Sequence, residues 1–273
     1  MVKRLKHHLR LWGLTPEKLW GKYGPHPAPK ILANSLPKSG THLLERFLSL
    51  VPGVSRQFDR KLCDDGKGLR GLQRQCSRLR KGQFLLAHLF YNDEYLKVLD
   101  QFGIKSMLMI RDPRDIVVSS YQYMTYGYKK HNMHDYFANH LKTDKERLHV
   151  CIRGNTNPEE YSIGYLLEKF YPWTQNEKVL TIRFRDLIGV KGGGSHETQK
   201  RTADEILNFI GVDLSNAQRE ELMKKVFFTG SKTFHKGRIS QWKEEFDEQD
   251  KALFKEFAGE WLIKLGFEKD YNW

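Results

Sequence analysis

The run Ile104–Ile110 constrains the fold most, because it is a largely apolar stretch that no turn residue interrupts. A strand of this kind is typical of a parallel sheet that is covered on both faces. Three further short apolar stretches have strand character, and helix-like segments separate them: Ile31–Asn34, Phe84–Ala87 and Val179–Phe184. Strands that alternate with helices predict a three-layer α/β fold, with a central parallel sheet flanked by helices.

The expected helices follow the strands in turn. They cover His42–Leu48, a segment from Asp112 to about Met124, Thr202–Ile210 and a last amphipathic stretch from about Gln249 to Leu265. The Thr202-x-x-Glu205 pattern predicts a capping box at the start of the third helix. Residues 1–30 are predicted to be a basic N-terminal extension, because Gly24 and several prolines interrupt any regular element there. Residues 31–273 are then expected to form a single domain.

The charge balance favours anionic partners. Lys and Arg total 46 against 33 Asp and Glu, which gives a net charge of +13. A membrane-spanning helix needs about 18–20 consecutive apolar residues, and no apolar run in the sequence approaches this length. No secretory signal is evident either. The three cysteines, Cys63, Cys76 and Cys151, have no metal-ligand spacing and do not form an even set. We therefore expect a cytoplasmic protein without a transmembrane segment.

The most informative stretch is Pro37–Thr41, which joins the first strand to the first helix. Gly40 lets backbone N–H groups approach an anion, and the following helix directs its positive dipole end to the same place. Lys38 adds a full charge, and Ser39 and Thr41 add hydroxyl groups. The nucleotide triphosphatase loop places lysine after its second glycine. Here lysine precedes the only glycine, so a kinase or an ATPase is disfavoured.

Three further segments extend this pattern: Arg111–Ser119, the R-F-x-D-L turn within Leu180–Leu187, and the basic loop Phe234–Lys243. In order and spacing, the four segments resemble the sulfotransferase family that uses 3′-phosphoadenosine 5′-phosphosulfate (PAPS). The resemblance covers about residues 31–246. It implies a P-loop-type α/β fold and transfer of the sulfuryl group from PAPS to a hydroxyl or an amine of a small-molecule acceptor. The product nucleotide would be 3′,5′-adenosine bisphosphate (PAP).

The resemblance also assigns the loop that holds the 5′-phosphosulfate. Its residues would be Lys38, Ser39, Gly40, Thr41 and His42. Phe184 stands where family members usually have a tyrosine near the nucleotide. Leu43 replaces a tryptophan that is common in cytosolic animal enzymes, so adenine stacking is expected from Trp242 or Phe184.

A second set is implied to bind the 3′-phosphate. Arg111 and Ser119 match one part of it, and His235, Lys236 and Gly237 match the late R-K-G element. His235 departs from the usual arginine and lacks its bidentate fork.

Catalysis is expected to rest on Lys38, Ser119 and His88. Lys38 would stabilise charge on the leaving 5′-phosphate, and Ser119 would restrain it. His88 ends the strand Phe84–Ala87, where α/β folds place active residues, and is the candidate base for the acceptor hydroxyl. Glu45 is the alternative, as in carbohydrate-type sulfotransferases that use a glutamate base.

Two other expectations concern partners. A basic nucleic-acid-binding module would explain the net charge but not four ordered motifs, and the sequence has no recognisable nucleic-acid-binding motif. We therefore expect no nucleic acid partner. We also expect no metal, since the donor is already activated.

Overall fold

The structure is a computed structural model that describes residues 28–57, 61–63, 68–154, 162–227 and 238–273. It falls into two units. Unit 1 comprises Met1–Ile110 and Trp173–Phe228, and unit 2 comprises Arg111–Pro172 and Thr229–Trp273. Most of the predicted N-terminal extension lies outside the described residues, and its boundary at residue 30 stays a prediction.

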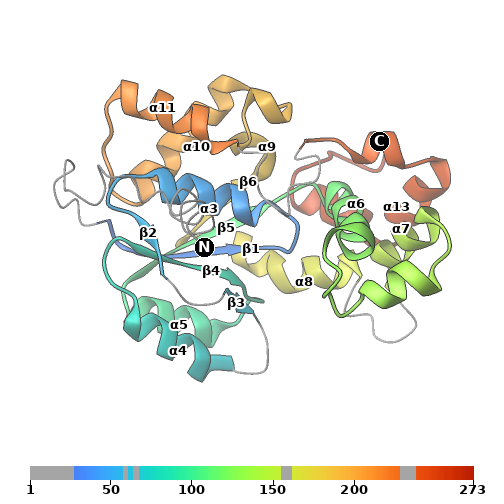
Figure 1. The fold of residues 1–273 in the computed structure, drawn as a ribbon, viewed down its shortest axis with the longest axis horizontal. Coiled ribbons are helices and arrows are strands. Elements are labelled where there is room, and N and C mark those ends of the chain that lie inside the picture. Colours follow the sequence, from blue (N-terminus) through green and yellow to red (C-terminus); the bar gives the residue numbers. More distant parts are fainter. Residues whose placement is uncertain (1–27, 58–60, 64–67, 155–161, 228–237) are drawn as a thin grey trace, which may run out of the picture. The chain divides into compact units, whose positions relative to one another are not determined.

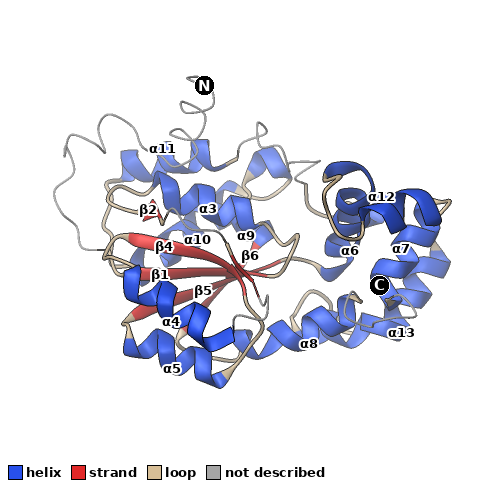
Figure 2. Ribbon diagram, turned by 60° about the horizontal axis from the view of Figure 1, so that its bottom comes forward, coloured by secondary structure: helices blue, strands red, loops and turns tan. Residues whose placement is uncertain are grey.

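Unit 1 is built on a parallel sheet, which Figure 2 shows in red. The described strands are β1 (Lys30–Ser35), β2 (Ser55–Arg56), β3 (Leu62–Cys63), β4 (Gln83–His88), β5 (Ile104–Ile110) and β6 (Val179–Arg183). They follow the order β2-β4-β1-β5-β6, and β3 also pairs with β4. Each described pair of strands is parallel. The predicted α/β fold with a central parallel sheet is confirmed.

Helices cover both faces of this sheet (Figure 1). One face carries α3 (Thr41–Leu50), α10 (His196–Phe209) and α11 (Asn216–Val226), and the other carries α4 (Gly68–Arg78) and α5 (Asp93–Gln101). Every residue of β5 except Lys105 is buried, as expected for a strand with helices on both sides. The central position of β5 therefore explains its largely apolar character.

Two predicted boundaries in unit 1 are wrong. The helix predicted from Thr202 begins at His196, because Ser195 is its N-cap and its side chain accepts a hydrogen bond from the Thr198 N–H. Thr202 instead lies buried in the helix interior. The strand predicted to reach Phe184 ends at Arg183, and Phe184 begins the short helix α9 (Phe184–Leu187).

Unit 2 is helical in its described part. Its elements are α6 (Pro113–Gln122), the π-helices η1 (Tyr123–Gly127) and η2 (Tyr136–His140), α7 (Asp144–Arg153), α8 (Ile163–Thr174, up to Pro172), α12 (Trp242–Glu245) and α13 (Glu248–Lys264). Helix α6 packs against α7, α12 and α13. Across both units, no helix of the described chain is long and apolar enough to cross a membrane.

The carboxyl ends of β1 and β4 are joined by the buried side chain of Asn34. Its Nδ2 donates to the Leu89 carbonyl at 2.9 Å, and its Oδ1 accepts from the Leu89 N–H at 2.9 Å. The same carbonyl accepts from the Trp173 indole N–H at 2.9 Å. One amide side chain thus takes the place of a strand neighbour at the point where the two strands end.

Replacing Asn34 by alanine should therefore destabilise unit 1. The Leu89 N–H would lose its acceptor inside the protein, and we expect a loss of about 1–3 kcal/mol in the free energy of unfolding. Chemical denaturation measures this loss. Asn139→Ala is the matched control, because its amide bonds Asp135 on the surface. Equal stability of the two variants would contradict the structural role of Asn34.

Candidate active site

The loop between β1 and α3 is fastened to the end of β5. Ser39 Oγ lies 2.7 Å from the Leu36 carbonyl oxygen and 2.8 Å from that of Met109. The Leu36 N–H also donates to the Met109 carbonyl at 3.3 Å. Ser39 is fully buried, so its hydroxyl holds the loop in place in this structure. Its assignment to the donor site stays a prediction.

Two left-handed residues, one on either side of Ser39, shape this loop. Lys38 has φ 66° and Gly40 has φ 108°, both in the left-handed region that favours glycine. A Cβ at position 40 would lie 2.5 Å from Phe184 Cδ2, so the aromatic ring of Phe184 rests against the loop backbone. Glycine is required at this position both for its backbone angle and for the close approach of Phe184.

Helix α3 starts directly after this loop and presents a positive end. Gly40 is its N-cap, no side chain caps it, and its first turn carries no acidic residue. The first N–H groups of a helix have no acceptor within the helix. With the dipole of a ten-residue helix behind them, they form a site suited to an oxyanion.

His88 lies next to this loop because β1 and β4 are parallel neighbours that end together. Its Nδ1 is 2.6 Å from the Ser35 carbonyl oxygen and 3.3 Å from Ser35 Oγ. Ser35 Oγ in turn lies 2.8 Å from Thr41 Oγ1, in the first turn of α3. Hydrogen bonds thus connect the histidine, the end of β1 and the start of α3.

The protonation state of His88 follows from these contacts. Burial lowers the pKa of His88 to about 3, and the nearby charge of Lys61 adds to the shift. The imidazole is therefore neutral at neutral pH. A contact of 2.6 Å to a carbonyl oxygen requires a proton on Nδ1, so we assign the lone pair to Nε2.

Glu45 is held in a different environment. Arg56 Nη1 donates to its Oε1 at 2.7 Å, and His42 Nδ1 is 3.0 Å from its Oε2. Burial raises the pKa of Glu45, but the bond to His42 and the charge of Arg56 outweigh it, and the net pKa lies below its ordinary value. Both carboxylate oxygens are engaged, and the group is a stabilised anion.

Unit 2 holds Arg111 and Ser119, two of the residues expected to bind the 3′-phosphate. Arg111 follows β5 directly, is buried, and donates from Nη2 to the Arg238 carbonyl at 2.9 Å. Ser119 lies two turns further along, on α6, and is half-buried. His235, Lys236 and Gly237 lie outside the described residues.

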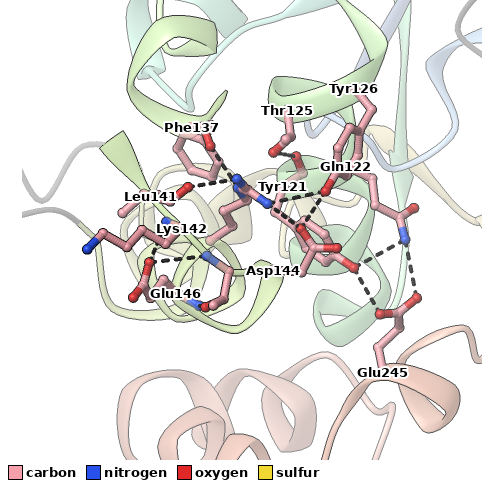
Figure 3. A network of polar contacts seen from close by, with 12 residues as sticks. Tyr121, Gln122, Thr125, Tyr126, Phe137, Leu141, Lys142, Asp144, Glu146 and Glu245 are labelled. Carbon is pink, nitrogen blue, oxygen red and sulfur yellow. Dashed lines mark hydrogen bonds and ion pairs between the residues drawn. The ribbon is translucent and has the colours of Figure 1, made fainter. Parts of the chain in front are cut away.

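The chain after Ser119 is fixed by a polar network in unit 2, shown in Figure 3. Tyr121 donates to Glu245 Oε2 at 2.8 Å, and Gln122 donates to Glu245 Oε1 at 3.3 Å. Burial raises the pKa of Tyr121, so it remains a donor. Thr125 Oγ1 donates to the Tyr121 carbonyl at 2.7 Å, where α6 gives way to the π-helix η1. These bonds hold α6 against α12 within unit 2.

The sequence patterns assigned no role to Asn34, Ser35 or Asp115. Ser35 and Asn34 stand at the strand end, where a polar residue in an apolar run was the available signal. Asp115 is buried in the first turn of α6 and accepts from two backbone N–H groups, those of Ser240 and Trp242. A local sequence pattern cannot predict the contacts of Asp115 with Ser240 and Trp242, because these residues are far apart in the chain.

A metal site does not emerge from the part of the chain that is described. Among those residues, no three His, Cys, Asp or Glu side chains are grouped as metal ligands.

Comparison with known proteins now adds to this geometry. A family model described as the sulfotransferase domain matches residues 28–266. The chain belongs to the sulfotransferase-domain family. The resemblance inferred from the four motifs and the enzyme class that it implied are confirmed.

Two solved structures share the fold. Mouse sulfotransferase SULT7A1 complexed with PAP superposes with a TM-score of 0.64 at 18% identity, covering 86% of this chain and 84% of that one. Retinol dehydratase in complex with androsterone and inactive cofactor PAP gives 0.52 at 15% identity, covering 90% and 85%. Among curated proteins, no sequence matches this sulfotransferase at a significant level.

The neutral state of His88 predicts a pH dependence of stability. The pKa of His88 is about 3 in the folded protein, whereas a histidine in an unfolded chain has a pKa of about 6.5. Between these two pH values the unfolded chain therefore binds one proton more than the folded protein. The free energy of unfolding should therefore fall as the pH drops through this range, by up to about 1.4 kcal/mol per pH unit from this residue.

The variant His88→Asn isolates this contribution, because an asparagine Nδ2 can still donate to the Ser35 carbonyl. Urea unfolding across the range should show a shallower pH slope for this variant than for the wild type. If the unfolding free energies of the two proteins depended on pH with the same slope, the pKa of His88 in the folded wild type would not be lowered, and the prediction would be wrong.

Proposed function

We propose that this sulfotransferase transfers the sulfuryl group of PAPS to a hydroxyl or an amine of a small-molecule acceptor. The bond between sulfur and the bridging oxygen of the 5′-phosphate breaks, a bond forms from sulfur to the acceptor atom, and PAP leaves. Family membership and the oxyanion site at the start of α3 support this proposal. The PAP named with both structural neighbours supports the choice of donor.

The loop at Lys38 would bind the 5′-phosphosulfate. The N–H groups of Gly40, Thr41 and His42 at the start of α3 would donate hydrogen bonds to the anion. The positive charge of Lys38 would stabilise the negative charge that builds up on the leaving oxygen. In such a transfer charge accumulates on peripheral and leaving oxygens, so preorganised positive groups lower the barrier. The fastening of Ser39 and the packing of Phe184 supply this preorganisation.

The 3′-phosphate would be bound by Arg111 and Ser119, together with His235, Lys236 and Gly237. A buried guanidinium suits this role, because it stays charged at any physiological pH and can bind a phosphate through two N–H groups. Ser119 would add a hydroxyl donor, as the family resemblance implies.

His88 would take the proton of the acceptor on Nε2. Its neutral state provides the lone pair, and the bond from Nδ1 to Ser35 fixes the ring. The cations Lys61 and Lys38 help to lower the pKa of His88, so an anionic donor bound nearby would raise it and strengthen the base. Glu45, the base of the alternative carbohydrate-type reading, is instead engaged by Arg56 and His42.

A reducing cytoplasmic setting fits the thiols. Cys63, Cys76 and Cys151 form no disulfide in the structure, and the last two are buried. Burial raises the pKa of Cys76 to about 12, so this thiol is unreactive.

The first test is ligand-induced stabilisation. PAP should raise the melting temperature of the wild type, whereas ATP with magnesium and duplex DNA should not. A shift that appears only with duplex DNA and vanishes with salt would instead favour a nucleic-acid-binding module.

The second test separates the catalytic assignments by turnover with labelled PAPS and a panel of acceptors. Lys38→Ala should lower kcat by about 10²–10³-fold, because a positive group near the leaving oxygen is lost. His88→Asn should lower kcat by about 10²–10⁴-fold while PAP affinity is kept. Glu45→Gln is the matched control, and a larger loss in this variant than in His88→Asn would assign the base to Glu45.

A further inference from the structure

The first turn of α6 and the segment 238–242 are joined by one carboxylate in unit 2. Asp115 Oδ1 accepts from the Trp242 N–H at 3.1 Å, and its Oδ2 accepts from the Ser240 N–H at 3.0 Å. Arg111 Nε lies 3.6 Å from the same Oδ2. Arg111 also donates from Nη2 to the carbonyl of Arg238, at the start of that segment. Arg111 is thus held between Asp115 and the backbone that Asp115 binds.

Both charged groups of this cluster are buried. Asp115 is 2% exposed and Arg111 is 6% exposed. Such charges are tolerated only when a counter-charge and hydrogen bonds replace the lost water. Here each group supplies the counter-charge of the other, and three backbone groups of residues 238–242 supply the hydrogen bonds. The orientation of the guanidinium therefore depends on the carboxylate.

The segment 238–242 is itself held in an unusual conformation. Ser240 has φ 58°, a left-handed backbone angle that is uncommon for a residue with a side chain. Such conformations persist only where surrounding contacts enforce them. Gln241 Nε2 donates to the Arg238 carbonyl at 3.0 Å, and the Trp242 ring stacks on the Arg114 guanidinium at 3.9 Å.

Arg114 is in turn fixed on the other side. Its Nη2 donates to Asp112 at 2.7 Å and to Glu268 at 2.6 Å, and its guanidinium also lies 4.4 Å from the centroid of the Trp273 ring. The segment is therefore braced at two points, by Asp115 through its backbone and by Arg114 through the indole of Trp242.

We propose that Asp115 is a positioning residue for recognition of the 3′-phosphate. It fixes the Arg111 guanidinium and the turn at 238–242, although its own negative charge opposes an anionic ligand. The proposal rests on the proposed function, in which Arg111 binds the 3′-phosphate of the donor. The negative charge of Asp115 weakens the electrostatic attraction between Arg111 and a phosphate. Asp115 would therefore favour phosphate binding only by orienting the Arg111 guanidinium.

The test compares two nucleotides that differ only at the 3′ position. Isothermal titration calorimetry with PAP and with adenosine 5′-monophosphate gives the preference of each variant for the 3′-phosphate. Asp115→Asn keeps the shape of the side chain but removes its charge and one of its two acceptors. We expect this variant to lose at least about tenfold of the preference for PAP, with binding of the monophosphate changed by less than about threefold.

Kinetics provide a second readout that general destabilisation would not reproduce. Asp115→Asn should raise the KM for PAPS while kcat at saturating donor stays within about threefold of the wild type. In an Arg111→Ala background, Asp115→Asn should cause no further loss of preference, because both act through one guanidinium. Additive losses in the double variant would contradict the proposal.

Two other variants keep the test decisive. Asp144→Asn is the control, since it weakens an ion pair with Arg147 elsewhere in unit 2 and should leave the preference unchanged. Asp115→Glu keeps the charge, should fold if Asp115→Asn does not, and should still lose preference because its carboxylate is displaced.

The outcomes separate the two levels of the proposal. A wild type without preference for PAP over the monophosphate would overturn the proposed function itself. A wild type that prefers PAP, with Asp115→Asn and Asp115→Glu equally selective, would overturn only the positioning role. Equal losses for both nucleotides would do the same, because they would indicate a merely structural effect.

Discussion

The backbone of the loop Leu36–Gly40 is the constraint on which the site of unit 1 depends. Two left-handed residues turn the chain from β1 into α3, and the buried hydroxyl of Ser39 ties that turn to β5. Phe184 fills the space that a side chain at Gly40 would need. These contacts within unit 1 define the backbone of the loop, and preorganised positive groups of this kind suit an anion.

The electrostatics of unit 1 are arranged around this positive end. His88 is kept neutral beside Lys38 and Lys61, with its proton held on the nitrogen that faces Ser35. Glu45 is kept anionic by Arg56 and His42. The His88 imidazole can accept a proton on Nε2, whereas the Glu45 carboxylate is engaged in an ion pair with Arg56. Environment, rather than residue type, thus separates the two candidate bases.

Sequence patterns predicted the features of the fold that local chemistry determines. The apolar run of β5 matches its bounds residue for residue, because a central strand must be apolar on both faces. The start of α10 was misplaced, since both Ser195 and Thr202 have the residue types of an N-cap and only tertiary packing selects between them. The two-residue strands β2 and β3 and the two π-helices carry no periodic signal at all.

The same distinction applies to the site. The loop Pro37–Thr41 could be picked out as a candidate anion site because its glycine, lysine and hydroxyl groups are neighbours in the sequence. The role of Asp115 could not, because its partners Ser240 and Trp242 are more than 120 residues away. Likewise, the pKa of His88 depends on its burial and on the charge of Lys61. Both result from the fold, and neither can be read from the residues next to His88 in the sequence.

A crystal structure of the protein with bound PAP would test the central claim most directly. It should show the 5′-phosphate at the start of α3, within hydrogen-bond distance of the N–H groups of Gly40 and Thr41 and in contact with Lys38. A 5′-phosphate bound away from this loop, with the loop empty, would contradict the claim that its rigid backbone is the donor site.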